Sequence, residues 1–293
     1  MSVVDKFLRQ VFKGVSWQNK YIYLIILALD LPDWVVCQMR GLSHLPKYSI
    51  RVRSDGVTGQ FGGNNFDYFG NFTAQLLIDS ALLTSKSKVL EIGCGSGRTA
   101  LALTKTLEKG NYMGVDIDKV SINACQRHQL FQQSGFVFEH IDVQNMMYNS
   151  QGKTSPKSYK FSFEDASFDH IFLISVFTHM LPEEVSNYIG EISRLLRPGG
   201  KCMLSTFLMD YGTEGKILNF PYQHDVYHLH QESLPEKAVG YYQSFFEEKF
   251  TSLNMSLLTK RIGNWRSFPV EENLIEFGQD VLVFSKYKWK RSL

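Results

Sequence analysis

The sequence predicts an α/β protein in which helices cover both faces of one doubly wound, mostly parallel sheet. Short apolar runs of the kind found in buried strands recur along the chain, and segments with apolar residues at helical spacing separate them. A glycine-rich turn follows the first of these runs, at residues 93–97. The chain has 293 residues, 44% of them hydrophobic, which is enough to bury the core of one such domain.

Residues 1–46 precede the alternation of strands and helices, and we expect them to form a helical cap. Apolar residues recur at helical spacing in residues 7–15. The apolar run at residues 21–29 is shorter than the ~20 residues of a membrane span, and no small-residue cleavage site follows it. We therefore expect neither a transmembrane segment nor a signal peptide. The cap would cover a ligand site or contact a second copy in a homodimer, with contact to a membrane surface as the alternative.

Residues 47–293 carry the alternation itself, and we expect them to form a single domain. Residues 51–70 are rich in glycine, asparagine and aromatic residues, which favours a structured loop. A helix follows near residues 72–83, where Leu76, Leu77, Ala81 and Leu82 have the spacing of core positions.

The turn after the first predicted strand combines an acid with three alternating glycines. Glu91 lies in the strand, and Gly93, Gly95 and Gly97 follow it. Such glycines let the backbone turn sharply and approach a ligand closely, before a helix that begins near Arg98. Their G-x-G-x-G spacing differs from the G-x-G-x-x-G of dinucleotide-binding turns, and an acid beside the turn would repel a diphosphate.

The second predicted strand ends at Asp116, whose carboxylate can accept hydrogen bonds from both hydroxyls of a ribose. The glycine turn and this acid, one helix apart, predict a nucleoside-binding site. A helix at residues 119–133 leads to a third strand at residues 138–143, which contains Asp142, and residues 149–158 form a polar insertion.

The fourth predicted strand, residues 168–174, leads into a loop that contains Ser175 and His179. Pro182 begins the next helix, since proline is accepted in a first turn. A Pro-Gly-Gly turn at residues 198–200 ends that helix before the fifth strand.

Three histidines lie among aromatic residues in a segment after the fifth strand, residues 207–234. Imidazole is a common metal ligand, but no set of carboxylates or cysteines completes a site around His224, His228 and His230. We therefore expect an irregular lid without a metal ion.

Taken in order, the glycine turn, Asp116, Asp142, the fourth strand with its loop and the turn at residues 198–200 resemble the motifs of the class I S-adenosylmethionine-dependent methyltransferases. The matches extend from about residue 62 to residue 286. The resemblance implies a Rossmann-like methyltransferase fold with seven strands, of which the last, residues 281–285, is antiparallel. It also implies S-adenosyl-L-methionine as the cofactor, because the ammonium and sulfonium of this ligand tolerate an acid beside the loop.

The resemblance assigns the cofactor site to a set of residues around the predicted strand ends. These residues are Glu91, Gly93, Cys94, Gly95, Gly97, Asp116, Ile117, Asp142, Val143, Ser175 and Tyr68. Asp142 would accept a hydrogen bond from the adenine amino group. Tyr68 would close the methionine end of the pocket, because the segment before the glycine turn often folds over the cofactor in this family; anchoring of the loop to the core is its alternative role.

His179 is the candidate catalytic residue, as a general base, because it lies just beyond the fourth strand and imidazole titrates near neutral pH. A sulfonium already makes its methyl group electrophilic, so the enzyme mainly has to align the acceptor and exclude water. A base is needed only where the acceptor must lose a proton. A loop histidine that hydrogen-bonds to the backbone is the other interpretation of His179.

The expected function is transfer of a methyl group to an oxygen or nitrogen of a small-molecule acceptor. A non-catalytic S-adenosylmethionine-binding protein and a methyltransferase of macromolecules are the alternatives, and the glycine spacing disfavours an NAD-dependent reductase. A net charge of +2 without a basic stripe gives no sign of nucleic-acid binding. The four cysteines form no C-x-x-C pair, which favours reduced thiols in the cytoplasm.

Overall fold

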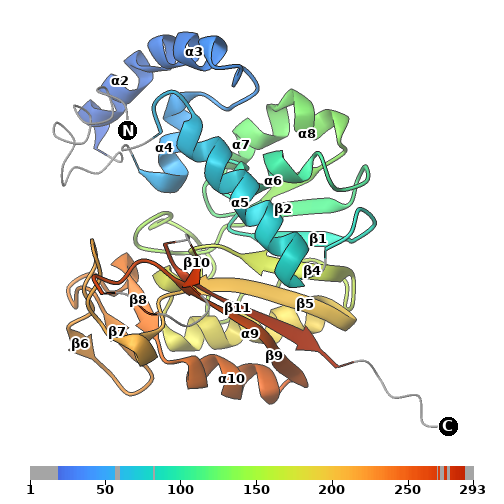
Figure 1. Cartoon of the computed structure of the whole chain (residues 1–293), viewed down its shortest axis with the longest axis vertical. Helices are drawn as coiled ribbons and strands as arrows, with labels where there is room; N and C mark the ends of the chain where they lie inside the picture. Colours follow the sequence, from blue (N-terminus) through green and yellow to red (C-terminus); the bar gives the residue numbers. More distant parts are fainter. Residues whose placement is uncertain are drawn as a thin grey trace. The chain divides into compact units, whose positions relative to one another are not determined.

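The structure is a computed structural model that describes residues 19–56, 60–81, 83–268, 270, 274–275 and 278–287. The chain divides into two compact units (Figure 1). The first unit comprises Met1–Leu76 and Cys94–His140, and the second comprises Leu77–Gly93 and Ile141–Leu293. The helix predicted around residues 7–15, and Leu82 of the predicted core helix, lie outside the described residues.

The first unit combines helices with a pair of parallel strands. Its helices are α2 (Lys20–Ala28), α3 (Asp30–Met39), α4 (Tyr48–Asp55), α5 (Asn64–Ala81, up to Leu76), α6 (Arg98–Leu103), α7 (Lys119–Arg127) and α8 (Gln129–Gln133). Strand β2 (Tyr112–Asp116) pairs in parallel with β3 (Val137–His140), so that Asp116 lies opposite His140. The helix predicted at residues 119–133 is two helices, because the backbone is extended at His128.

The predicted N-terminal cap is helical where it is described, and α4 extends it beyond residue 46. Ile26 of α2 packs against Tyr48 and Val52 of α4, and all three side chains are fully buried. Asp33 of α3 and Arg51 of α4 form a buried ion pair with an N–O distance of 2.7 Å. Apolar packing and one buried charge pair therefore hold these helices together.

The prediction of a loop at residues 51–70 is wrong for most of this range. Helix α4 continues to Asp55, and α5 already begins at Asn64. The glycines and asparagines suggested a loop, but the fully buried Phe66 extends the apolar face of α5 by nearly two turns towards its N-terminus. Tertiary packing of one aromatic side chain outweighs weak local propensities.

The second unit contains six strands in the order β10-β9-β11-β5-β4-β1. Strands β1 (Val89–Ile92), β4 (Phe168–Leu173) and β5 (Leu196–Thr206) pair in parallel. Strand β11 (Asp280–Lys286) runs antiparallel to β5 and to β9 (Met255–Gly263), as predicted for the last strand. A two-residue strand, β10 (Leu274–Ile275), pairs in parallel with β9.

The mostly parallel α/β sheet with flanking helices is confirmed. Seven strands correspond to the prediction, and β10 adds one more in the part of the chain that the structure describes. Helix α9 (Pro182–Leu195) begins at the predicted proline, and α10 (Gln243–Thr251) precedes β9. The predicted turn at residues 198–200 lies inside β5, where the register against β4 shifts between Phe168 and His170.

Residues 207–234 are more regular than the predicted lid. Strands β6 (Tyr222–Gln223), β7 (Tyr227–Leu229) and β8 (Val239–Tyr241) form an antiparallel sheet. A cluster of buried side chains lies in the same unit: Phe207, Met209, Phe220, Ala238 and Trp265. Within residues 207–234, strands β6 and β7 satisfy the backbone groups of residues 222–223 and 227–229 by pairing.

A fully buried carboxylate, Asp280 at the start of β11, ties several segments of the second unit together. It accepts hydrogen bonds from the backbone of Leu208 and Gly263 and from the indole of Trp265. It also pairs with the equally buried guanidinium of Arg266, at 2.9 Å. The charge is compensated on all sides, as a buried carboxylate requires.

Candidate functional site

The glycine loop of the first unit needs glycine for two separate reasons. Gly95 and Gly97 both have left-handed backbone angles, with φ of 50° and 80°. A side chain at Gly95 would begin 2.5 Å from the hydroxyl of Ser54, and one at Gly97 would begin 2.8 Å from the ring of Phe131. The loop is therefore bent and closely packed at once, and the N-terminus of α6 follows it directly.

Asp116 joins the end of β2 to this loop. One carboxylate oxygen accepts a hydrogen bond from Gly95 N at 2.6 Å, and the other accepts from Asp118 N at 2.7 Å. Burial raises the pKa of Asp116 to about 6, although the backbone donors favour its ionised form. The backbone of Ile117 is a third donor, and the four lone pairs of the carboxylate still leave capacity for a ligand.

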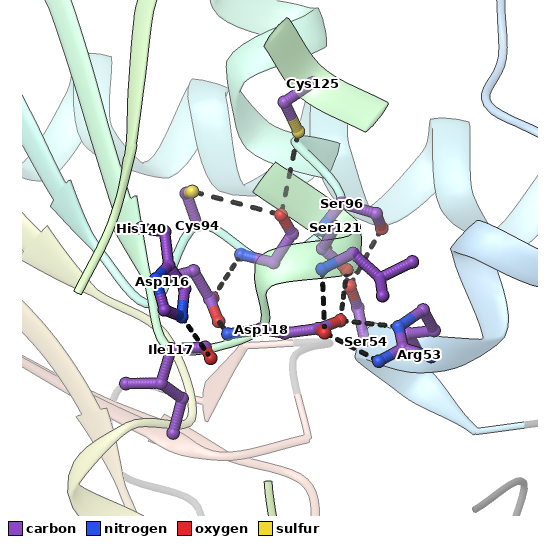
Figure 2. A network of polar contacts seen from close by, with 12 residues as sticks. Arg53, Ser54, Cys94, Ser96, Asp116, Ile117, Asp118, Ser121, Cys125 and His140 are labelled. Atoms are coloured by element: carbon purple, nitrogen blue, oxygen red, sulfur yellow. Dashed lines mark hydrogen bonds and ion pairs between the residues drawn. The ribbon is translucent and has the colours of Figure 1, made fainter. Parts of the chain in front are cut away.

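Two side chains at the end of α4 reach the same region, as Figure 2 shows. Arg53 forms a bidentate ion pair with Asp118, with both N–O distances 2.6 Å. The hydroxyl of Ser54 accepts a hydrogen bond from Ser96 N at 2.9 Å and lies 2.8 Å from the hydroxyl of Ser96. Burial opposes ionisation of Asp118, but hydrogen bonds from Arg53 and Ser121 outweigh it and lower its pKa.

Two further predicted residues of the first unit, Cys94 and Ile117, each lie close to a polar partner. Thiols of Cys94 and Cys125 both lie near the carbonyl of Gly95, at 3.9 and 3.6 Å (Figure 2). The carbonyl of Ile117 lies 3.2 Å from Nε2 of His140. The first unit thus brings five of the predicted residues together: Cys94, Gly95, Gly97, Asp116 and Ile117.

Tyr68 lies on α5, and half of its side chain is exposed. Its ring contacts Phe69 with a centroid distance of 5.2 Å and stacks on Phe72 at 6.4 Å. Both partners lie on the same helix, so these contacts do not test the anchoring role considered for this residue. Closure of the methionine end of a pocket by Tyr68 stays a prediction.

In the second unit, Glu91 and Gly93 lie at the end of β1. Glu91 is buried within the strand. Gly93 has φ of 77°, and a side chain there would clash with Val176, in the loop after β4. The close approach of the two loop segments explains why this position carries glycine.

Asp142 lies two residues beyond the end of β3, which stops at His140 rather than at residue 143 as predicted. Its carboxylate accepts a hydrogen bond from the side chain of Asn149 at 3.3 Å, and the same amide donates to the carbonyl of Val143 at 3.0 Å. A bridge between Val143 and Thr154 folds the polar insertion back onto this backbone. The insertion therefore positions Asp142.

Ser175 begins the loop after β4 with a strained backbone, at φ of 59°. Its amide donates to the hydroxyl of Ser205 at 2.8 Å, and that hydroxyl donates to the side chain of Gln279 at 2.5 Å. Neighbouring strands β5 and β11 thus hold the loop in this conformation.

His179 ends the short 3₁₀ helix Phe177–His179 and is fixed on both ring nitrogens. Its Nδ1 lies 2.8 Å from the carbonyl of Glu236, which can only accept, so this nitrogen carries the proton. Nε2 lies 3.4 Å from the hydroxyl of Tyr148. Burial lowers the pKa of His179, and the hydrogen bond to Glu236 partly offsets that effect.

One short segment, residues 145–149, connects Asp142 with His179. Asn149 binds the carboxylate of Asp142, and Asn145 donates to the carbonyl of His179 at 3.0 Å. Tyr148 contacts the imidazole of His179 edge-on, with ring centroids 5.3 Å apart. The second unit therefore brings the predicted adenine-binding acid and the predicted base to the same segment.

The three histidines of residues 207–234 have separate partners. His228 lies 2.9 Å from the hydroxyl of Tyr242, His230 lies 2.7 Å from the carbonyl of Asn219, and His224 stacks on Tyr227. Within the described residues, no group of three or more histidines, cysteines and acids could hold a metal ion.

Sequence reasoning missed four side chains of the candidate site: Arg53, Ser54, Tyr148 and Asn149. Tyr148 precedes the polar insertion and Asn149 begins it, and an asparagine in such a segment signals local side-chain to backbone bonding. Such a signal marks a structured loop without revealing what the loop positions.

Residues 90–204 match a family described as a methyltransferase domain. This segment contains the glycine loop, Asp116, Asp142 and the loop after β4. The predicted resemblance to class I S-adenosylmethionine-dependent methyltransferases is confirmed for this segment.

Two curated proteins illustrate the similarity in sequence. Phthiotriol/phenolphthiotriol dimycocerosates methyltransferase 1 of Mycobacterium ulcerans is 35% identical over 117 residues, which are 40% of this chain and 36% of that protein. A fatty-acid O-methyltransferase of Mycolicibacterium smegmatis is 30% identical over 113 residues, 39% of this chain and 34% of that protein. The chain thus spans about a third of the length of these relatives.

A solved structure extends the similarity in fold. The PH0226 protein of Pyrococcus horikoshii OT3 superposes with a TM-score of 0.50 over 75% of this chain and 91% of that one. The two sequences are 20% identical, so the likeness concerns the fold alone.

Proposed function

We propose that this chain, whose residues 90–204 match a methyltransferase domain, transfers a methyl group from S-adenosyl-L-methionine to a small molecule. The observation that carries the proposal is the position of Asp116. Its carboxylate is bound to the glycine loop by Gly95 N and has Asp118 and Ile117 as further backbone donors, and its lone pairs leave capacity for a ribose hydroxyl.

The residues of the chain fit this cofactor. The left-handed glycines leave no side chain between the loop backbone and a ligand. The hydrogen bonds that Asp116 accepts come from uncharged backbone N–H groups. We assign ribose binding to Asp116 and adenine binding to Asp142 with Val143. The other residues that we assign to the cofactor are Glu91, Gly93, Cys94, Gly95, Gly97, Ile117, Ser175 and Tyr68.

The bound cofactor supplies an electrophilic methyl group on a sulfonium. The chain's own part is to align the acceptor and, where the acceptor carries a proton, to remove it. With its proton on Nδ1, held by Glu236 O, His179 presents Nε2 as a base. The hydroxyl of Tyr148 faces that nitrogen and can pass a proton to it.

The names of the relatives support a small-molecule acceptor, and one of them specifies transfer to oxygen. One is named as an O-methyltransferase of fatty acids, and the other as a methyltransferase of phthiotriol and phenolphthiotriol dimycocerosates. We place the reaction in the cytoplasm, because the four cysteines are buried thiols without a disulfide.

Two measurements on the full chain test the proposal. Calorimetry should show binding of S-adenosylmethionine and no measurable binding of NADH. Incubation with methyl-labelled S-adenosylmethionine and a lipid or metabolite extract should then label one class of small molecule. Tighter binding of NADH would overturn the cofactor assignment. Binding without transfer to any extract fraction, with Asp142 and His179 intact, would instead support the non-catalytic alternative.

A further inference from the structure

Helices α2 and α3 are apolar on two opposite faces. The inner face packs on α4 through Ile26, with Ile22, Leu29 and Val36 beside it. The outer face carries large apolar side chains that are 48–83% exposed: Tyr21, Leu24, Ile25, Leu31, Trp34 and Met39. A helix that is apolar all round is normally buried in a core or in lipid.

The charges of this segment are sorted by sign. Its two acids bind inward: Asp30 accepts from the backbone and hydroxyl of Ser49, both at 2.8 Å, and Asp33 pairs with Arg51. The exposed charged side chains in the described part of residues 19–47 are all basic, namely Lys20, Arg40 and Lys47. Lys20 begins α2 and Arg40 follows α3, where its guanidinium also donates to the carbonyl of Gly62 at 3.2 Å. Exposed apolar side chains flanked by basic ones complement anionic lipid headgroups.

We propose that the outer face of α2 and α3 lies on the surface of an anionic membrane, with its apolar side chains among the lipid headgroups. The proposal rests on this surface alone and does not depend on the methyl transfer proposed above. A membrane position would also suit a fatty-acid acceptor.

The segment lies on the membrane rather than across it. Lys20–Met39 is long and apolar enough to cross a membrane by length and composition, with a mean hydropathy of 1.6 and 17% of its apolar window buried. Crossing would separate Asp33 from Arg51 and Asp30 from Ser49, leaving acids without partners in hydrocarbon. The buried inner face therefore keeps the helices parallel to the surface.

A second copy of the chain is a poorer partner for the same face. A two-fold contact places the same patch on both sides. Lys20 or Arg40 would then approach basic groups of the partner's patch, and the described face offers no exposed acid to pair with them.

Vesicle binding of the full chain, without cofactor, tests the proposal. Co-sedimentation should show binding to vesicles of phosphatidylcholine mixed with phosphatidylglycerol, and weak binding to phosphatidylcholine alone. The triple variant Leu24→Gln, Leu31→Gln and Trp34→Gln should bind at least about tenfold more weakly. The matched control replaces three exposed apolar residues elsewhere: Val137→Gln, Ile217→Gln and Leu258→Gln.

Each outcome decides the question. Binding that requires the anionic lipid, is lost in the triple variant and is kept in the control supports the proposal. A blue shift of tryptophan fluorescence on vesicle addition, absent in Trp34→Phe, supports it as well. Absence of binding by the wild type overturns it, even if a chain that lacks residues 1–18 binds. So does a wild-type dimer that the triple variant turns into monomers, or membrane association that resists alkaline extraction.

Discussion

Asp116 is the residue at which the structure makes the cofactor assignment most testable. Its raised pKa of about 6 means that the carboxylate is ionised at neutral pH and becomes protonated just below it. A protonated carboxyl is a weaker acceptor for two ribose hydroxyls.

We therefore expect the affinity for S-adenosylmethionine to fall by up to about tenfold per pH unit below pH 6. Asp116→Asn should weaken binding at pH 7 by about 1.5–3 kcal/mol and remove this pH dependence. Calorimetry over a pH series measures both effects, with the exposed Asp225→Asn as the control. An Asp116→Asn variant with wild-type affinity and the same pH profile would sink the assignment.

His179 makes the proposed proton transfer testable. A base must be neutral, and burial lowers the pKa of His179 from its ordinary value of 6.5. Activity should thus be complete at pH 7 and decline on acidification only below pH 6.5, as the imidazole becomes protonated. His179→Ala should lower kcat by about 10²–10⁴-fold, leave cofactor affinity nearly unchanged and lack that acidic limb.

His230→Ala is the matched control, because His230 also binds a backbone carbonyl. A His179→Ala variant whose loss appears only in the KM of the acceptor would assign His179 to pocket shape. Full turnover with an unchanged profile would remove it from the mechanism.

At the residue scale, the sequence predicts those residues of the candidate site that belong to a local motif, and it misses those that come from distant segments. Gly95 and Asp116 stand at recognisable positions after strands. Arg53 and Ser54 reach their partners over separations of 65 and 42 residues, in a stretch predicted to be a loop. No periodicity in the sequence records such a contact.

At the scale of elements, the C-terminal end of α4 should contribute to stability through the ion pair of Arg53 with Asp118. The bidentate pair of Arg53 with Asp118 is mostly shielded from solvent, with exposed side-chain fractions of 12% and 15%. Arg53→Gln should therefore lower the free energy of unfolding by about 1–3 kcal/mol. Urea unfolding checks this, with the exposed Arg127→Gln as the control. Equal unfolding of the two variants would show that the pair contributes nothing.

Strand β11 depends on a buried charge in the same way. Asp280→Asn leaves the guanidinium of Arg266 buried without its counter-charge, which should cost about 3–5 kcal/mol. The double variant Asp280→Asn with Arg266→Met should recover part of the loss. Thermal unfolding measures both, and a double variant less stable than Asp280→Asn would contradict this account.

At the element scale, strands and helices with strong apolar periodicity were predicted well. Helix α9 and strand β11 are where the pattern indicates. Elements whose residues have weak propensities were missed: the start of α5 depends on Phe66, and β6, β7 and β8 depend on hydrogen bonds between segments. Tertiary contacts decide such elements, and a single sequence does not display them.

For the whole molecule, the order of the alternating elements sufficed to predict a mostly parallel sheet, because parallel strands require crossover connections. The antiparallel last strand followed from the family resemblance. The domain boundary predicted after residue 46 stays a prediction, and the structure offers a direct way to test it.

Deletion of residues 1–46 should destabilise the chain rather than release an intact domain. It removes Asp33 and Ile26, and leaves Arg51 buried without a counter-charge, so we expect a loss of about 3–5 kcal/mol from the charge alone. Deletion of residues 1–18 keeps the pair and serves as the control.

The two causes of this loss can be separated. If the unpaired charge dominates, Arg51→Met in the shortened chain should recover stability and solubility, because it replaces a buried cation by an apolar side chain of similar length. If lost apolar packing around Ile26 dominates, the same substitution should recover little. A shortened chain that unfolds at the same urea concentration as the full chain would show instead that residues 47–293 fold on their own, as the predicted boundary requires.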